Sequence, residues 1–187
     1  MRVLLARHGQ TEWNVLGRRQ GQLDSPLTSA GFAQAHSHAK TLAGVGLDKI
    51  FTSPLGRAAT TAGIIGAALG LAPVVLDDLA ELHHGDFAGL TNADIAERFP
   101  EAARERAQDK YHWPFPNGES YADADHRAAK ALRAIAERAS RPLVVSHEMI
   151  GRMLLRNLLD EEPTEALSRD QPHDVIYVVT DGKLARS

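Results

Sequence analysis

The sequence predicts an α/β protein in three layers, with a mostly parallel central sheet and helices on both of its faces. Short apolar runs, typical of buried strands, alternate along the chain with longer segments of helical periodicity. The 187 residues are 43% hydrophobic and 24% charged, as in an ordinary globular protein. This length favours one domain. We therefore expect a single domain over residues 1–187, with an insertion of loop and helix at about residues 81–120.

Five strands are expected, each a short apolar run that ends at polar residues or at a turn. The first run stops at Arg7-His8-Gly9, and the last is followed by a turn at Asp181-Gly182. Strands that alternate with helices favour a parallel arrangement. The expected strands are Val3–Ala6, Lys49–Thr52, Val74–Leu76, Leu143–Ser146 and Val175–Thr180.

Six helices are expected between and after these strands. The strongest amphipathic pattern covers Ser120–Ala139, where Tyr121, Leu132 and Ile135 share one face with several alanines. Glycine ends two of the other helical patterns, at Gly44 and Gly70. The remaining expected helices are Ser29–Ala43, Arg57–Leu69, Asn92–Phe99, Glu101–Gln108 and Met149–Leu159.

Three segments have no steady period and are expected to be irregular. Gln10–Thr28 is long, polar and glycine-rich, and loops of that length in compact domains are usually functional or disordered. Glu81–Leu90 carries two glycines and two histidines, and Trp113–Gly118 carries two prolines and a glycine. Gln10–Thr28 is therefore a candidate functional loop, and Trp113–Gly118 is interpreted as part of an insertion.

The composition excludes several classes of function. The chain has 21 Lys and Arg against 24 Asp and Glu, a net charge of −3, so neither nucleic acid nor a membrane is expected as a partner. The absence of cysteine excludes disulfides, thiolate catalysis and iron–sulfur clusters. The apolar run at the N-terminus is too short for a signal peptide, and no run is long enough to span a membrane. We expect a cytoplasmic protein.

The residues that follow the expected strands point to phosphate chemistry. In open α/β sheets, ligands bind beyond the carboxyl ends of the strands. Arg7 and His8 follow the first strand, Arg57 the second, Glu81 the third and His147 the fourth. Arginine binds phosphate oxygens in pairs, neutral imidazole can act as a nucleophile, and a carboxylic acid can protonate a leaving oxygen. No G-x-G-x-x-G or Walker motif follows a strand, which argues against dinucleotide or ATP chemistry.

Each of these residues taken alone also has an ordinary structural interpretation. Arg7 and His8 fit a surface pair at a strand end, and Glu81 fits a solvated loop carboxylate. His147 fits a buried histidine of the core. Arg57 fits the first turn of a helix, although arginine there opposes the helix dipole and so favours an anionic partner.

Taken together, the motifs around these residues resemble those of the histidine phosphatase superfamily, also called the phosphoglycerate mutase-like family. The resemblance covers nearly the whole chain, and the blocks occur in the order of the family. The blocks are Arg7-His8-Gly9-Gln10-Thr11-Glu12-Trp13-Asn14, Gln20-Gly21-Gln22-Leu23-Asp24-Ser25-Pro26-Leu27-Thr28, Ser53-Pro54-Leu55-Gly56-Arg57-Ala58, Leu79-Ala80-Glu81, Gly118-Glu119-Ser120 and Val144-Val145-Ser146-His147.

The resemblance implies a role for each candidate residue. His8 is expected to attack phosphorus and become phosphohistidine. Arg7, Arg57 and His147 are expected to bind the phosphoryl oxygens. Glu81 is expected to protonate the leaving alkoxide and then to activate water. The resemblance implies no metal and no organic cofactor.

Further contacts to phosphate or substrate are expected from the long loop, at Asn14, Gln20 and Gly21. The chain departs from the family pattern after His147, where many members have glycine and this sequence has Glu148. A carboxylate that faced the pocket would repel a phosphorylated substrate. We therefore expect Glu148 to cap the N-terminus of the following helix, where negative charge is favourable. Glu148 is also a candidate substrate-binding residue, and in that position it would alter the substrate preference.

The sequence favours a phosphatase that acts on a small phosphomonoester over a cofactor-dependent phosphoglycerate mutase. The interval between Glu81 and His147 is short, whereas the mutases carry a longer insertion with extra basic residues. Trp113, Phe115 and Phe87 are candidates for an apolar wall of the pocket. The mutase activity remains an alternative, as does a non-catalytic module that binds a phosphorylated ligand. The leucine pairs of the helix after His147 leave a homodimer open.

Overall fold

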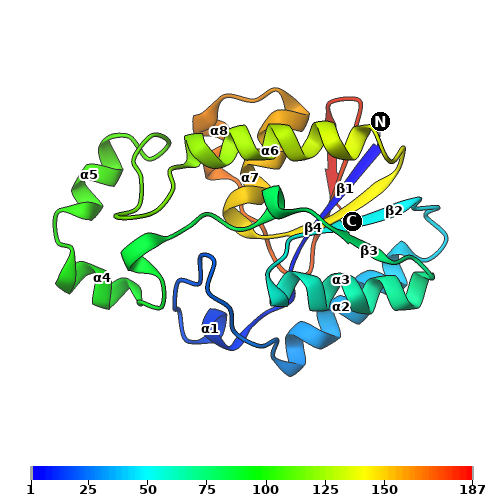
Figure 1. Cartoon of the computed structure of the whole chain (residues 1–187), viewed down its shortest axis with the longest axis horizontal. Coiled ribbons are helices and arrows are strands. Elements are labelled where there is room, and N and C mark those ends of the chain that lie inside the picture. The colour runs from blue at the N-terminus through cyan, green and yellow to red at the C-terminus, as the bar shows by residue number, and fades with distance from the viewer. Residues whose placement is uncertain (1, 187) are drawn as a thin grey trace.

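A mixed sheet in the order β3-β2-β4-β1-β5-β6 forms the centre of the computed structural model, which describes residues 2–186 (Figure 1). β3, β2, β4 and β1 run parallel, while β5 is antiparallel to β1 and β6 is antiparallel to β5. The expected mostly parallel sheet is thus confirmed. The strands are β1 (Arg2–Arg7), β2 (Lys49–Thr52), β3 (Pro73–Val75), β4 (Pro142–Ser146), β5 (Ile176–Thr180) and β6 (Lys183–Arg186).

Helices cover both faces of the sheet, which confirms the predicted three layers. α2 and α3 pack together on one face, and α6, α7 and α8 lie on the other (Figure 1). The helices are α1 (Glu12–Val15), α2 (Ser29–Leu42), α3 (Gly56–Leu69), α4 (Asn92–Arg98), α5 (Ala102–Gln108), α6 (Tyr121–Ala136), α7 (Glu148–Leu159) and α8 (Pro163–Ser168), with 3₁₀ turns η1 (Asp77–Leu79) and η2 (Gly85–Phe87). No helix within residues 2–186 is both long and apolar enough to cross a membrane.

The alternation of side chains along the strands divides the core into two parts. Leu4 and Ala6 of β1 join the cluster beneath α2 and α3, while Val3 and Leu5 join the cluster beneath α6 and α7. Burial on both faces explains why the strands are continuous apolar runs. In α7, Leu154 and Leu155 are fully buried in the core, so these two leucines are not a dimer face.

The carboxyl ends of β1, β4 and β2 lie at one edge of the sheet. Arg7 pairs with Ser146 across β1 and β4, and Thr52 pairs with Val145 across β2 and β4. Because these parallel strands end in nearly the same register, the residues that follow them emerge close together. The predicted convergence at this edge is confirmed by the pocket described below.

The structure adds elements that the sequence pattern did not predict. The long segment Gln10–Thr28 contains the short helix α1, which begins with a capping box between Thr11 and Asn14. The helix α8 and the edge strand β6 were also missed, because each is short and has no clear period. Phe32 of α2 is 44% exposed, although it is one of the apolar residues of that helix.

Candidate active site

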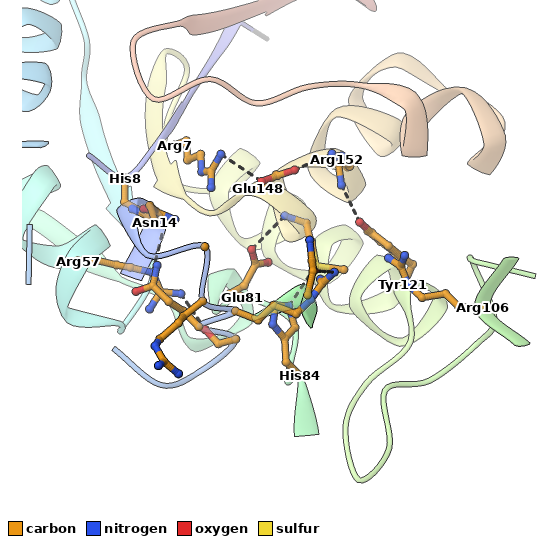
Figure 2. Close-up of a pocket in the computed structure, with 17 residues that line it drawn as sticks. Arg7, His8, Asn14, Arg57, Glu81, His84, Arg106, Tyr121, Glu148 and Arg152 are labelled. Carbon is orange, nitrogen blue, oxygen red and sulfur yellow. Dashed lines mark hydrogen bonds and ion pairs between the residues drawn. The ribbon is translucent and has the colours of Figure 1, made fainter. Parts of the chain in front are cut away.

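A pocket of about 360 Å³ opens at the carboxyl edge of the sheet, and the predicted site residues gather around it (Figure 2). Its volume is at the lower end of the range of small-molecule sites, about 300–1,000 Å³. His147 lies behind the pocket wall, with its ring centre 5.1 Å from that of His8. The predicted residues that line the wall are Arg7, His8, Asn14, Gln20, Gly21, Arg57, Glu81 and Glu148.

His8 is held as a neutral imidazole whose unprotonated Nε2 can act as a nucleophile. Its Nδ1 lies 2.8 Å from the carbonyl oxygen of Gly9, which identifies Nδ1 as the protonated nitrogen. The Nε of Arg57 donates to Nε2 at 3.3 Å. Burial, together with the charges of Arg57 and Arg7, holds the pKa of His8 well below its usual value of 6.5. A neutral His8 is the form that can attack phosphorus.

Arg57 ties the long loop to the nucleophile. Its Nη1 donates to Leu23 O at 2.7 Å and to Asp24 Oδ1 at 2.9 Å, and its Nη2 donates to Gly21 O at 2.7 Å. Asp24 also accepts from the backbone N–H of Arg57 at the start of α3. An arginine at the start of a helix favours an anionic partner, and here that partner is Asp24. The sequence analysis did not predict this pairing.

Glu148 faces the pocket, which corrects the expectation that it caps α7. Its Oε2 lies 3.1 Å from Nη1 of Arg7, and its Oε1 accepts from Nη2 of Arg152 at 2.7 Å. These two guanidinium groups offset the repulsion that the carboxylate would otherwise exert on a bound phosphate. Arg7 also donates to Gln171 O at 2.9 Å, so its position depends on two segments that follow β4.

Glu81 takes the place at the start of α7 that was expected for Glu148. Its Oε2 accepts from Met149 N at 3.1 Å, and its Oε1 accepts from Ile150 N at 2.9 Å and from Leu82 N at 3.0 Å. A carboxylate offers about four lone pairs. Oε2 therefore keeps one lone pair that can carry a proton towards the pocket.

Several buried nitrogen atoms around the pocket have no partner within residues 2–186, among them Arg7 Nε and His147 Nδ1. The Oγ of Ser53 lies 2.7 Å from His147 Nε2 and accepts from Leu55 N, and we assign its hydroxyl proton to Nε2. With this assignment the proton of His147 lies on Nδ1. Unpaired buried donors are costly, and an anion would satisfy them.

Asn14, Gln20 and Gly21 line the pocket in different ways. The Oδ1 of Asn14 accepts from Thr11 in the capping box, which leaves its NH₂ group for a ligand. The side-chain amide of Gln20 donates one N–H to Thr11 and accepts from Ser25, so it organises the loop and keeps a second N–H. Gly21 has φ +53°, and a Cβ there would lie 2.9 Å from His84.

Packing between loops decides the placement of His84 and of three aromatic residues. His84 lies in the segment Glu81–Leu90, yet it is 6% exposed, lines the pocket and packs against Phe115 at 4.6 Å between ring centres. Trp113, Phe115 and Phe87 pack on one another in a cluster and do not line the pocket. The wall is polar, and the apolar wall predicted from these aromatics is wrong.

The remaining part of the wall contains residues that the sequence analysis did not predict at the site. Among them are Arg18, Arg19, Arg106, Tyr121 and Arg152. Arginine is common throughout this chain, and only the folded structure selects the ones that face the pocket. Within residues 2–186, no group of three or more His, Asp or Glu side chains is placed to hold a metal ion.

Comparisons with known proteins agree on one family. A family model described as histidine phosphatase superfamily (branch 1) matches residues 3–183. A curated relative from Yersinia enterocolitica, named "Probable phosphoglycerate mutase GpmB", is 40% identical over 87% of this chain and 77% of its own length.

Solved structures with this fold include phosphatases. A mycobacterial glucosyl-3-phosphoglycerate phosphatase in complex with VO3 has a TM-score of 0.88 and 29% identity, and the match covers 100% of this chain and 96% of that one. A protein from Escherichia coli K-12, provisionally assigned as an alpha-ribazole-5'-P phosphatase, has a TM-score of 0.89 and 25% identity, with 100% and 94% covered.

Proposed function

The chain belongs to the histidine phosphatase superfamily (branch 1), and we propose that it is a phosphatase that hydrolyses a small phosphomonoester through a phosphohistidine at His8. One observation carries this proposal. The neutral Nε2 of His8 lies beside Arg57 in a pocket that Arg7 and Glu81 also line. The site thus combines a nucleophile with cations that can bind phosphate and with a carboxyl group that can act as an acid.

In the first step, Nε2 of His8 attacks phosphorus as the bond from phosphorus to the ester oxygen breaks. Charge spreads over the phosphoryl oxygens, where Arg7, Arg57 and the Nδ1–H of His147 stabilise it. Glu81 gives its proton to the leaving alkoxide, which departs as an alcohol. His8 then carries the phosphoryl group, and Glu81 is a carboxylate.

In the second step, water attacks phosphorus and displaces Nε2 of His8. The carboxylate of Glu81 accepts a proton from that water, and inorganic phosphate leaves. His8 returns to its neutral form with the proton still on Nδ1, where Gly9 O accepts it. All the proton transfers use residues of this chain.

A phosphoglycerate mutase is the second candidate, because the curated relative carries that name and is 40% identical to this chain over 168 aligned residues. A mutase returns the phosphoryl group to a second hydroxyl of the substrate, whereas a phosphatase transfers it to water. Interconversion of 2- and 3-phosphoglycerate without release of phosphate would favour the mutase. A binding module that lacks catalysis would bind phosphate tightly without turnover.

The test measures hydrolysis of p-nitrophenyl phosphate with excess EDTA by the wild type and by His8→Ala. We expect turnover in the wild type and a loss of several orders of magnitude in His8→Ala, because no other nucleophile replaces the imidazole. His36→Ala changes an exposed histidine of α2 and serves as the matched control. An inactive wild type, or an active His8→Ala variant, would overturn the proposal.

A further inference from the structure

The backbone carbonyl oxygen of His8 is held by a second imidazole, that of His173. The Nδ1 of His173 lies 2.6 Å from His8 O, and the centres of the two rings are 5.3 Å apart. Because a carbonyl oxygen can only accept, we assign a proton to this Nδ1. His173 is half-buried and does not line the pocket, so it reaches the reaction only through His8.

The peptide group between His8 and Gly9 is held by hydrogen bonds at both of its polar atoms. Its oxygen accepts from His173, and its N–H donates to Oγ1 of Thr61 at 3.0 Å. Because a peptide group is planar, bonds to the N–H and the C=O together fix the rotation of the whole group. A Cβ on Gly9 would lie 2.4 Å from Gly31 O, so this backbone also packs closely against α2.

The orientation of this backbone decides which nitrogen of His8 is the nucleophile. The next carbonyl oxygen, Gly9 O, accepts the proton of His8 Nδ1 at 2.8 Å. Glycine has no Cβ to restrict its backbone, so the direction of Gly9 O depends on how the flanking peptide groups are held. The hydrogen bond of one ring nitrogen sets which nitrogen carries the proton. If Gly9 O turns away, part of the molecules carry the proton on Nε2, and these cannot attack phosphorus.

His173 is itself fixed in position and is neutral. The Nε2 of His38, which is buried on α2, donates to His173 O at 2.9 Å. Burial, together with the charge of Arg7, lowers the pKa of His173 to about 4, so its ring carries no charge at neutral pH. Two residues before His173, Gln171 O accepts from Nη1 of Arg7 at 2.9 Å. The segment between α8 and β5 therefore holds both Arg7 and His8 at the carboxyl end of β1.

We propose that His173 is a positioning residue for the nucleophile: its Nδ1–H holds His8 O, which keeps the proton of His8 on Nδ1 and leaves Nε2 unprotonated. This inference rests on the proposed function, because it takes His8 as the nucleophile. Both chemical steps use Nε2, first as the attacking atom and then as the departing one. Loss of His173 should therefore slow these steps, while the binding of phosphate by Arg7 and Arg57 stays the same.

The first experiment measures which ring nitrogen of His8 carries the proton. His173→Leu removes the donor, whereas His173→Asn keeps an amide nitrogen at the same number of bonds from Cα as Nδ1. Nitrogen-15 NMR of histidine-labelled protein at neutral pH distinguishes the two tautomers, and the spectrum of His8→Ala identifies the signals of His8. We expect only the Nδ1–H form in the wild type and in His173→Asn, and a mixture with the Nε2–H form in His173→Leu.

The second experiment measures kcat for p-nitrophenyl phosphate and the inhibition constant of inorganic phosphate. In His173→Leu we expect kcat to fall about threefold to tenfold, the range for one hydrogen bond between neutral groups. The loss is partial because Gln10 N still donates to Oε1 of Gln34 at 2.8 Å and holds the peptide group that carries Gly9 O. His173→Asn should restore kcat, and the inhibition constant should stay the same in both variants. His36→Leu, at an exposed position of α2, is the matched control.

An unchanged tautomer in His173→Leu would overturn the proposal, and so would a loss of kcat that His173→Asn does not restore or that weaker phosphate binding accompanies. If His173→Leu does not fold, His173→Gln replaces it, because its amide lies one bond further from Cα, at the place of Nε2. The mixture of tautomers is expected there too, and its absence would reject the role of His173. If His8→Ala remains active, the proposed function fails separately, while the NMR measurement still tests the contact between His173 and His8.

Discussion

Glu148 places a carboxylate beside the proposed phosphate site, and its environment explains how the pocket tolerates this charge. The carboxylate bridges Arg7 and Arg152, and Arg152 in turn donates to the Tyr121 hydroxyl. Arg7 is therefore connected to Tyr121 through Glu148 and Arg152. Glu148 organises the arginines, but its negative charge also reduces the attraction of the pocket for anions.

Glu148→Gln is expected to tighten product inhibition. The amide can still accept from one arginine, while the negative charge near Arg7 is removed. We expect the inhibition constant of inorganic phosphate to fall about three- to tenfold, the effect of about 1 kcal/mol from a partly exposed charge. Glu97→Gln on the exposed face of α4 is the control. Weaker inhibition would show instead that Arg7 needs the carboxylate for its position.

The N-terminus of α7 is capped by a residue that is distant in sequence. The helix begins after His147, whose side chain forms no cap, and the first backbone N–H groups donate to Glu81. The helix dipole favours negative charge at this end. The same carboxyl group is therefore a cap for α7 and the proposed acid, so the orientation of the acid depends on the helix.

Glu81→Gln is expected to slow hydrolysis selectively according to the leaving group. An alkyl phosphate needs protonation of its leaving oxygen, and its kcat should fall by about 10²–10⁴. Hydrolysis of p-nitrophenyl phosphate should fall much less in the first step, because nitrophenolate leaves without a proton. Burst kinetics on both substrates measure this difference. Equal losses on both would indicate a structural role for Glu81 alone.

At the scale of the whole molecule, burial of histidines couples folding to pH. Burial, with the charge of nearby arginines, lowers the pKa of His84 to about 3 and that of His173 to about 4, and holds the pKa of His8 and His147 well below 6.5. In the unfolded chain these residues take up protons near pH 6.5. The unfolded state then binds more protons than the folded state, so stability falls as the pH drops below this value.

We therefore expect the free energy of unfolding, measured with urea, to decrease steadily from pH 6.5 to pH 4. Each buried neutral histidine contributes up to about 1.4 kcal/mol per pH unit to that slope. His84→Gln removes one such group and should reduce the slope between pH 4 and 6 by about that amount. Above pH 7 the two proteins should show parallel curves. An identical slope at acid pH would contradict a neutral, buried His84.

The fold class and the five residues at the strand ends follow from local patterns along the chain. Apolar runs of strand length and helical periodicity are properties of residues that are close in sequence. Their alternation along the chain predicted a central sheet with helices on both faces. Because parallel strands end at one edge of the sheet, Arg7, His8, Arg57, Glu81 and His147 were expected together, and they gather around one pocket.

The partners of these residues arise from contacts between segments that are distant in sequence, and no local pattern encodes them. Glu148 was expected at a helix cap that Glu81 occupies, because the approach of the segment after η1 to α7 is a tertiary contact. The burial of His84 and the meeting of Arg19 with Arg106 likewise depend on how the loops and α5 pack. The chain has many arginines, and only the tertiary packing decides which of them line the pocket.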